Sequence, residues 1–212
     1  MKRAAGLLLA ALLALSLCSC TAMIEKVKQY VTGDEPETMP EDYVESKADG
    51  AYEYDVYQEY IEITAYKGEA TEVTVPDTLD GKPVRRLGEL AFYGGAAVTA
   101  VTLPASLQEI GESAFYYCQE LTALKIPDSV TKIGMRAFAW CTSLQEVTLP
   151  AGLTAIPDYC FNYCTALEKL EVPAAVAQVG TRAFSYCKAL QAVSLPESVL
   201  GVGARAFADC PR

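Results

Sequence analysis

Acid–base chemistry in this chain would have to rest on carboxylates, because its 212 residues include no histidine. Histidine is the commonest general base, the usual partner of a serine or cysteine nucleophile, and the commonest metal ligand. Glu146, Glu168 and Glu171 fall on stretches with a strand pattern, where two carboxylates could act together as in glycoside hydrolysis. A sheet of repeated strands offers no deep pocket, however, and such glutamates usually only solvate a face. We therefore predict no catalytic residues and no enzyme.

Cysteine is the other residue type whose spacing suggests chemistry. Two of the eight cysteines lie in the first twenty residues. The other six are Cys118, Cys141, Cys160, Cys164, Cys187 and Cys210. Stacked about 5 Å apart they would be within reach of disulfides, yet side chains of a ladder point the same way, which favours buried free thiols. Cys160 and Cys164 are at most half of a metal site, so the sequence predicts no metal and no cofactor.

Residues 1–20 have the pattern of an export signal. Two basic residues follow Met1, and the uncharged apolar run from Gly6 to Leu17 is too short to span a membrane comfortably. The run closes on Leu-Cys-Ser-Cys, which resembles a bacterial lipobox with its small residue before the lipidated cysteine. We expect residues 1–19 to be a lipoprotein signal peptide and Cys20 to anchor the protein at the bacterial cell surface, its one contact with the membrane. An ordinary signal peptide with two incidental cysteines is the alternative.

Residues 20–49 contain little that could form a core. Between Asp34 and Glu62 there are eleven acids and a single base, Lys47, and the whole chain has a net charge of −10. A self-repelling segment of this kind extends, which predicts an acidic flexible tether over residues 20–49. The negative charge also argues against nucleic acid as a partner.

A period of 23 residues governs the rest of the chain. Phenylalanine recurs at this interval as Phe92, Phe115, Phe138, Phe161, Phe184 and Phe207. A proline, a cysteine and several apolar columns keep the same phase. A fixed period of this length is the signature of a solenoid, in which each unit buries its apolar side only against its neighbours.

Each unit predicts two short strands and a helical turn. Residues 121–126 follow a strand pattern that ends at Pro127, which cannot donate to a continuing ladder. Residues 130–133 predict a second extended stretch, closed by a turn at Gly134. Residues 135–141 place alanine, phenylalanine and cysteine on one side at helical spacing. We therefore predict an α/β solenoid with short helical turns.

The repeated pattern C-x-x-L-x-x-L-x-I-P-x-S-V-x-x-I-G-x-x-A-F-x-x-C resembles the BspA-type (Treponema-type) leucine-rich repeat of bacterial surface proteins. The similarity covers about residues 70–212. Residues 50–69 alternate like the family's N-terminal β-hairpin cap, with a turn near Gln58. The resemblance implies a leucine-rich repeat domain over residues 50–212, built as a right-handed solenoid with a parallel sheet on its concave side.

The departures from the pattern are few. Five extra residues stand between Pro76 and Val84, Gly95 replaces the cysteine of its unit, and Pro157 replaces the glycine of another. The resemblance further implies adhesion through recognition of an extracellular protein or glycan, with no catalytic residue to carry over.

Two stripes of side chains compete as the binding surface. Two residues after successive phenylalanines stand Tyr117, Trp140, Tyr163 and Tyr186. If the phenylalanines point inward along a helical turn, these rings face outward, where they would suit a sugar or an apolar patch. The alternative is that the rings stack on one another between rungs.

The rival stripe is the concave sheet. Its outward positions are Thr102, Lys125, Thr148, Glu171 and Ser194, flanked by Ala123, Glu146, Lys169 and Ala192. Concave solenoid faces are the usual binding surface, and this one is polar with charges of both signs. We predict a monomeric recognition module that binds an extracellular protein or glycan. The alternative is a structural protein that self-associates through its terminal strand.

Overall fold

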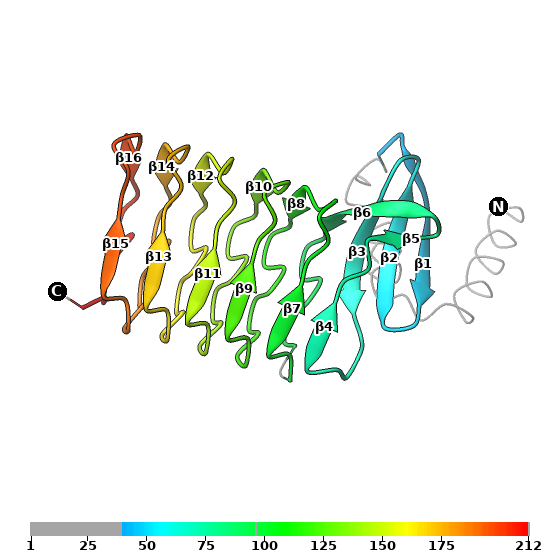
Figure 1. The fold of residues 1–212 in the computed structure, drawn as a ribbon, viewed down its shortest axis with the longest axis horizontal. Coiled ribbons are helices and arrows are strands. Elements are labelled where there is room, and N and C mark those ends of the chain that lie inside the picture. The colour runs from blue at the N-terminus through cyan, green and yellow to red at the C-terminus, as the bar shows by residue number, and fades with distance from the viewer. Residues whose placement is uncertain (1–39, 96, 212) are drawn as a thin grey trace, which may run out of the picture. The chain divides into compact units, whose positions relative to one another are not determined.

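The computed structural model describes residues 40–95 and 97–211, which form β-strands and tight turns (Figure 1). The chain divides into two compact units after Glu41, and the second of them is a β-solenoid. No described segment forms a helix long and apolar enough to cross a membrane. The predicted signal peptide, Cys20 and most of the predicted tether lie outside the described residues.

Six short parallel strands pair into one sheet in the order β4-β7-β9-β11-β13-β15 (Figure 1). They are β4 (Glu72–Thr74), β7 (Ala100–Thr102), β9 (Ala123–Lys125), β11 (Glu146–Thr148), β13 (Lys169–Glu171) and β15 (Ala192–Ser194). Each strand exposes its first and last residues and turns the middle one toward the core. Glu146 lies opposite Ala123 on one side and Lys169 on the other. The predicted parallel sheet and its 23-residue interval are confirmed.

A second set of strands runs along another edge of the rungs (Figure 1). These are β6 (Lys82–Leu87), β8 (Glu109–Ile110), β10 (Lys132–Ile133), β12 (Ala155–Ile156), β14 (Gln178–Val179) and β16 (Gly201–Val202). Their ladder is interrupted between β10 and β12. On either side of the break a glycine N–H donates to the preceding rung, Gly134 to Ile110 and Gly180 to Ile156, both at 2.8 Å. Pro157 holds this position in the rung between them and has no N–H to donate, which explains the break.

The predicted helical turns are wrong, because the segment from each glycine to the following cysteine is a run of tight turns. The Ala139 N–H donates three residues back to the Arg136 carbonyl at 3.0 Å, but the adjacent Trp140 N–H donates across to Asn162 of the next rung at 2.8 Å. Arg136 and Trp140 have φ of 56° and 64°, in the left-handed region that a right-handed helix excludes. Alternate N–H groups thus bond between rungs, so they cannot close a helix.

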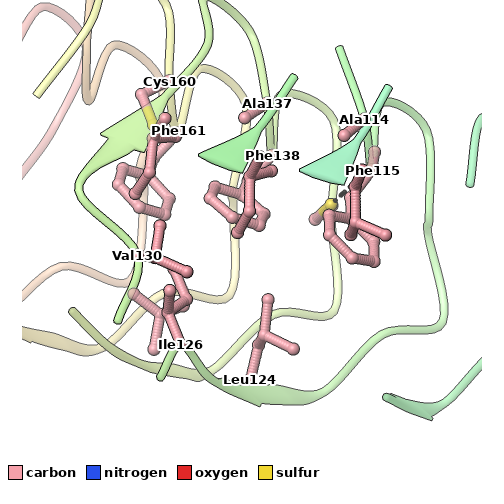
Figure 2. Close-up of a cluster of buried hydrophobic side chains, with 14 of the residues drawn as sticks. Ala114, Phe115, Leu124, Ile126, Val130, Ala137, Phe138, Cys160 and Phe161 are labelled. Atoms are coloured by element: carbon pink, nitrogen blue, oxygen red, sulfur yellow. Dashed lines mark hydrogen bonds between the residues drawn. The ribbon is translucent and has the colours of Figure 1, made fainter. Parts of the chain in front are cut away.

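The phenylalanine column forms the centre of the core. Consecutive rings from Phe92 to Phe207 stack with centroids 5.0, 5.5, 5.3, 5.5 and 5.1 Å apart. Figure 2 shows Phe115, Phe138 and Phe161 in this row, all with 0% of their surface exposed. Burial of one such ring removes enough apolar surface from water to contribute about 1.5–3 kcal/mol. The stack therefore supplies a core that no single rung could form.

The cysteine column supports the same stack by hydrogen bonding. Each thiol donates to the carbonyl of a phenylalanine in the preceding rung, as Cys141 does to Phe115 at 3.1 Å and Cys164 to Phe138 at 3.1 Å. The described cysteines are free thiols, in agreement with the favoured interpretation of the sequence. They satisfy carbonyls that would otherwise be buried without a partner.

Three antiparallel strands cap the first rung: β1 (Tyr43–Asp49), β2 (Tyr52–Tyr57) and β3 (Ile61–Tyr66). Strands β2 and β3 are the predicted hairpin, closed by a Tyr57 N–H that donates to the Tyr60 carbonyl at 2.9 Å around Gln58. Residues 43–49, assigned from the sequence to the tether, form β1 instead. The Tyr66 ring stacks on Phe92 at 5.2 Å, so the cap extends the phenylalanine column by one ring.

The five extra residues form a small hairpin that leaves the solenoid intact. Strand β5 (Thr78–Leu79) pairs with the start of β6 around Asp80 and Gly81, whose φ values of 50° and 72° suit a two-residue hairpin turn. Glu72 of β4 consequently pairs with Ala100, five residues beyond the usual interval.

Candidate functional site

The outer face of the six-stranded sheet, here called the sheet face, brings five of the predicted ligand-binding residues together. They are Lys125, Glu146, Thr148, Lys169 and Glu171, and all five are exposed. Glu146 lies opposite Lys169, and Thr148 lies opposite Lys125. Since strands of one sheet are about 4.8 Å apart, these groups span three neighbouring rungs and could contact one partner together.

The charges of the sheet face are unpaired within the described part of the chain. The ion pairs of the described residues use Lys47, Lys67, Arg86, Lys132 and Arg136 as their cations, and all of these lie elsewhere. The densest set crosses the second ladder, where Glu109 pairs with Arg86 at 3.2 Å and with Lys132 at 2.6 Å. Lys125, Glu146 and Lys169 make no such contact, although two of them are direct strand neighbours. Their charges remain available to a partner.

A groove of about 590 Å³ opens on the sheet face beside β11 and β13. Its polar lining comes from Glu146, Thr148, Lys169 and Glu171, and Pro173 lies at its border. The two strands pair at Glu146 and Lys169, whereas β9 and β11 pair over three residues. Reduced pairing separates the strand ends, and the groove lies where they part. Glu168, the third carboxylate weighed for catalysis, lies outside this lining and one residue before β13.

Two further residues of the sheet face were missed from the sequence. Glu72 and Thr74 of β4 are exposed and lie in register with Ala100 and Thr102. The five-residue insertion displaces them from the 23-residue phase, and the regular spacing therefore did not reach them. Adding five to the interval at the Asp80-Gly81 turn would have found them.

The predicted aromatic strip, Tyr117, Trp140, Tyr163 and Tyr186, is a continuous stack of rings. Trp140 lies 4.0 Å from Tyr163 with a 6° angle between ring planes, and Tyr163 lies 4.2 Å from Tyr186 at 10°. Tyr117 is farther from Trp140, at 5.6 Å and 23°. Each inner ring therefore covers the face of its neighbour, and ring edges are left for a ligand. The stacking alternative describes this geometry, and a sugar that needs a free ring face finds little room on the inner rings.

The aromatic strip continues at both ends. The Tyr116 ring contacts Tyr117 at 5.6 Å and stacks on Tyr93 at 5.8 Å, and Tyr93 is exposed. At the other end, a hydrogen bond with Tyr163 and the nearby Asp209 carboxylate raise the pKa of Tyr186 above its ordinary value. The hydroxyls of this end form a polar border to the rings.

A second column on the same turns was missed from the sequence. It comprises Arg136, Tyr159, Arg182 and Arg205, each four residues before a member of the 23-residue position that holds the strip. The guanidinium carbons of Arg136 and Arg182 lie 5.1 and 5.8 Å from the centroid of the Tyr159 ring. The mixture of residue types hides this column, because the search for periodicity followed apolar residues. A search by position within the repeat would have found it.

The buried thiols are unsuited to chemistry. Burial raises the pKa of Cys118 to about 12, and it raises the pKa values of Cys141, Cys160 and Cys164 well above the ordinary range. Such thiols are neutral at physiological pH, whereas the nucleophile and the metal ligand is the thiolate. Residues 40–95 and 97–211 contain no group of three or more cysteine and carboxylate side chains placed to hold a metal ion.

A repeating strand-and-turn rung with an apolar ladder defines a leucine-rich repeat solenoid, and the comparisons with known proteins agree. Six copies of the BspA type leucine-rich repeat match residues 85–212. The chain belongs to the BspA-type leucine-rich repeat family. A comparison with the curated proteins gave no match.

Solved structures of bacterial leucine-rich repeat proteins resemble this fold. A leucine-rich repeat protein of Treponema pallidum is 29% identical with a TM-score of 0.68, over 75% of this chain and 82% of that one. A leucine-rich cell surface protein of Faecalibacterium prausnitzii is also 29% identical with a TM-score of 0.61, over 81% of this chain and 54% of that one. A protein of Eubacterium ventriosum, 23% identical with a TM-score of 0.62 over 80% of this chain and 50% of that one, shares the fold. The chain spans about half the length of the latter two.

Proposed function

We propose that this protein is a non-enzymatic recognition module that binds an extracellular protein or glycan through its sheet face. The observation that carries the proposal is that Lys125, Glu146, Lys169 and Glu171 share one exposed surface and make no ion pair with one another. Exposed charges of both signs give specificity and orientation to an encounter more than they give affinity. A partner with complementary charges fits this pattern.

The location of this module follows from its leader and its relatives. The related protein of Faecalibacterium prausnitzii is described as a cell surface protein. We infer export to the bacterial surface, with Cys20 as the lipidated residue and membrane contact through that anchor. Multiple acyl chains satisfy the two-signal requirement for stable attachment to a membrane.

The test is affinity capture with the purified full chain in mild detergent, against matrix proteins, mucins and bacterial surface polymers. Once a ligand is captured, Lys169→Glu should weaken its binding, because the change reverses a central charge of the groove. Thr131→Glu is the matched control, since it places a carboxylate on an exposed residue away from the sheet face. Unchanged binding by Lys169→Glu, or equal loss in both variants, would rule the sheet face out.

Trp140→Ala separates the two predicted stripes in the same assay. Loss of affinity in Trp140→Ala alone, at matched stability, would assign this ligand to the aromatic strip and not to the sheet face. Loss in Lys169→Glu alone would select the sheet face.

A second candidate function is self-association through the last rung. Leu200 and Val202 are 88% and 51% exposed, and Leu195 of the adjoining strand end is 37% exposed. Exposed apolar side chains this close together favour burial against another chain. Sedimentation at increasing protein concentration distinguishes the two functions, because the first leaves the protein monomeric and the second requires a mass that grows with concentration.

A further inference from the structure

The turns that follow each glycine present two parallel columns on one surface, here called the turn face. One column is the aromatic strip, and the other is the arginine column of Arg136, Tyr159, Arg182 and Arg205. Both columns occupy left-handed positions of the turns, with φ of 64° at Trp140 and 51° at Arg182. Because every rung repeats this geometry, side chains of one column lie about 4.8 Å from those of the next rung.

The arginine column carries positive charge that the described residues do not neutralise. Arg136 lies 3.3 Å from the Glu112 carboxylate. Arg182 and Arg205 have no carboxylate of the described residues within ion-pair distance. Arg182 instead lies over the ring of Tyr159, which holds its guanidinium near the surface without satisfying its donors.

The aromatic strip adds to the same preference. Since its rings stack face to face, they turn their edges outward, and the edge of an aromatic ring carries the positive part of its quadrupole. Ring edges and guanidinium groups both favour anionic oxygen atoms. Neutral sugars, which stack on ring faces, are disfavoured.

We propose that the turn face is a second interaction surface, distinct from the sheet face, and that its partner is an acidic segment of a protein. Tryptophan, tyrosine and arginine are the residue types that dominate the energetics of protein interfaces, and the turn face concentrates all three. Carboxylates of the partner would pair with Arg182 and Arg205, and its backbone would lie along the aromatic strip.

The experiment uses Trp140 as the reporter, because it is the only tryptophan of the chain and lies inside the proposed surface. Its fluorescence is followed while the purified full chain in mild detergent is titrated with an oligo-glutamate peptide. The same titration with dextran sulfate and with neutral dextran tests sulfated and uncharged polysaccharides. We expect oligo-glutamate to change the emission of Trp140 saturably, with an affinity that falls as salt rises.

The double variant Arg182→Gln/Arg205→Gln should weaken oligo-glutamate binding about fivefold or more, because each arginine contributes one exposed ion pair. Neither arginine is ion-paired in the fold, so thermal melting should be unchanged. The matched control Lys125→Gln/Lys169→Gln removes the same charge from the sheet face and should leave oligo-glutamate binding intact.

Three results would overturn the proposal: no saturable response to oligo-glutamate, equal weakening in both double variants, or a saturable response to dextran sulfate alone. The last would assign the turn face to a sulfated glycan. Each of these can occur whether or not Lys169→Glu affects capture of a ligand by the sheet face, so failure here is separable from failure of the proposed function.

Discussion

Replacing Phe138 by alanine tests whether the stack is held together by its phenylalanine column. The Phe138 side chain is fully buried, and its ring stacks on Phe115 at 5.5 Å and on Phe161 at 5.3 Å. Removal of a buried phenylalanine costs about 3–5 kcal/mol of unfolding free energy, the upper part applying where the site cannot collapse. Neighbouring rungs are held in register by backbone hydrogen bonds on both sides of Phe138, so we expect little collapse and a loss near 4–5 kcal/mol.

Phe207→Ala is the matched change at the last rung. Phe207 is half-buried and has one stacking partner, Phe184 at 5.1 Å. With one neighbour in place of two, the expected loss is roughly half, about 2 kcal/mol. The losses are measured by urea unfolding of the wild type and both variants, with unchanged m-values as the sign that the same structure unfolds. Equal losses in the two variants would refute a stack whose stability comes from neighbouring rungs.

Three further predictions concern protonation, thiol reactivity and anchoring. Burial raises the pKa of Glu62 above 4.5, so the stabilisation from its protonated form is present below pH 4.5 and is lost as pH rises through the folded-state pKa; Glu62→Gln should therefore flatten the dependence of stability on pH above 4.5, and an unaltered pH profile would contradict this. Alkylation of the folded protein at pH 8, mapped by mass spectrometry, should label the half-exposed Cys210 before Cys118 and Cys141, and uniform labelling without denaturant would show that the column is open. Cys20→Ala should abolish metabolic lipid labelling and release the protein or leave it unprocessed, whereas persistent labelling would point to Cys18 or another mechanism.

The repeat was predictable because packing fixes its residue types. An inward position between two identical rungs accepts only side chains of one size, and the phenylalanine, cysteine and leucine columns therefore appear in the sequence with a constant interval. The strand that ends before each proline and the hairpin around Gln58 followed from the same local patterns. Even the break between β10 and β12 is readable once Pro157 is seen to lack the N–H that its column requires.

The turn geometry was not predictable from residue types. Positive φ at Arg136, Trp140 and Tyr163 is uncommon for such side chains, and nothing in their identity distinguishes a helical turn from a series of tight turns. What decides between them is tertiary: a carbonyl of the next rung is available to each alternate N–H, as Asn162 is to Trp140. Strand β1 was missed for a similar reason, because its pairing with β2 outweighs a composition typical of a linker.

The same geometry separates the conserved task of each rung from the task left to the surface. A core column must repeat one residue type, since a change in one rung alters the packing of two neighbours. The exposed positions of the sheet face and the turn face escape this constraint, because their side chains project from a backbone already fixed by hydrogen bonds between rungs. Charge and aromatic character can therefore vary from rung to rung at small cost in stability. In this chain they vary toward mixed, unpaired charge at Glu146 and Lys169 and toward arginine and aromatic edges beside Trp140, which gives one rigid stack two chemically different surfaces.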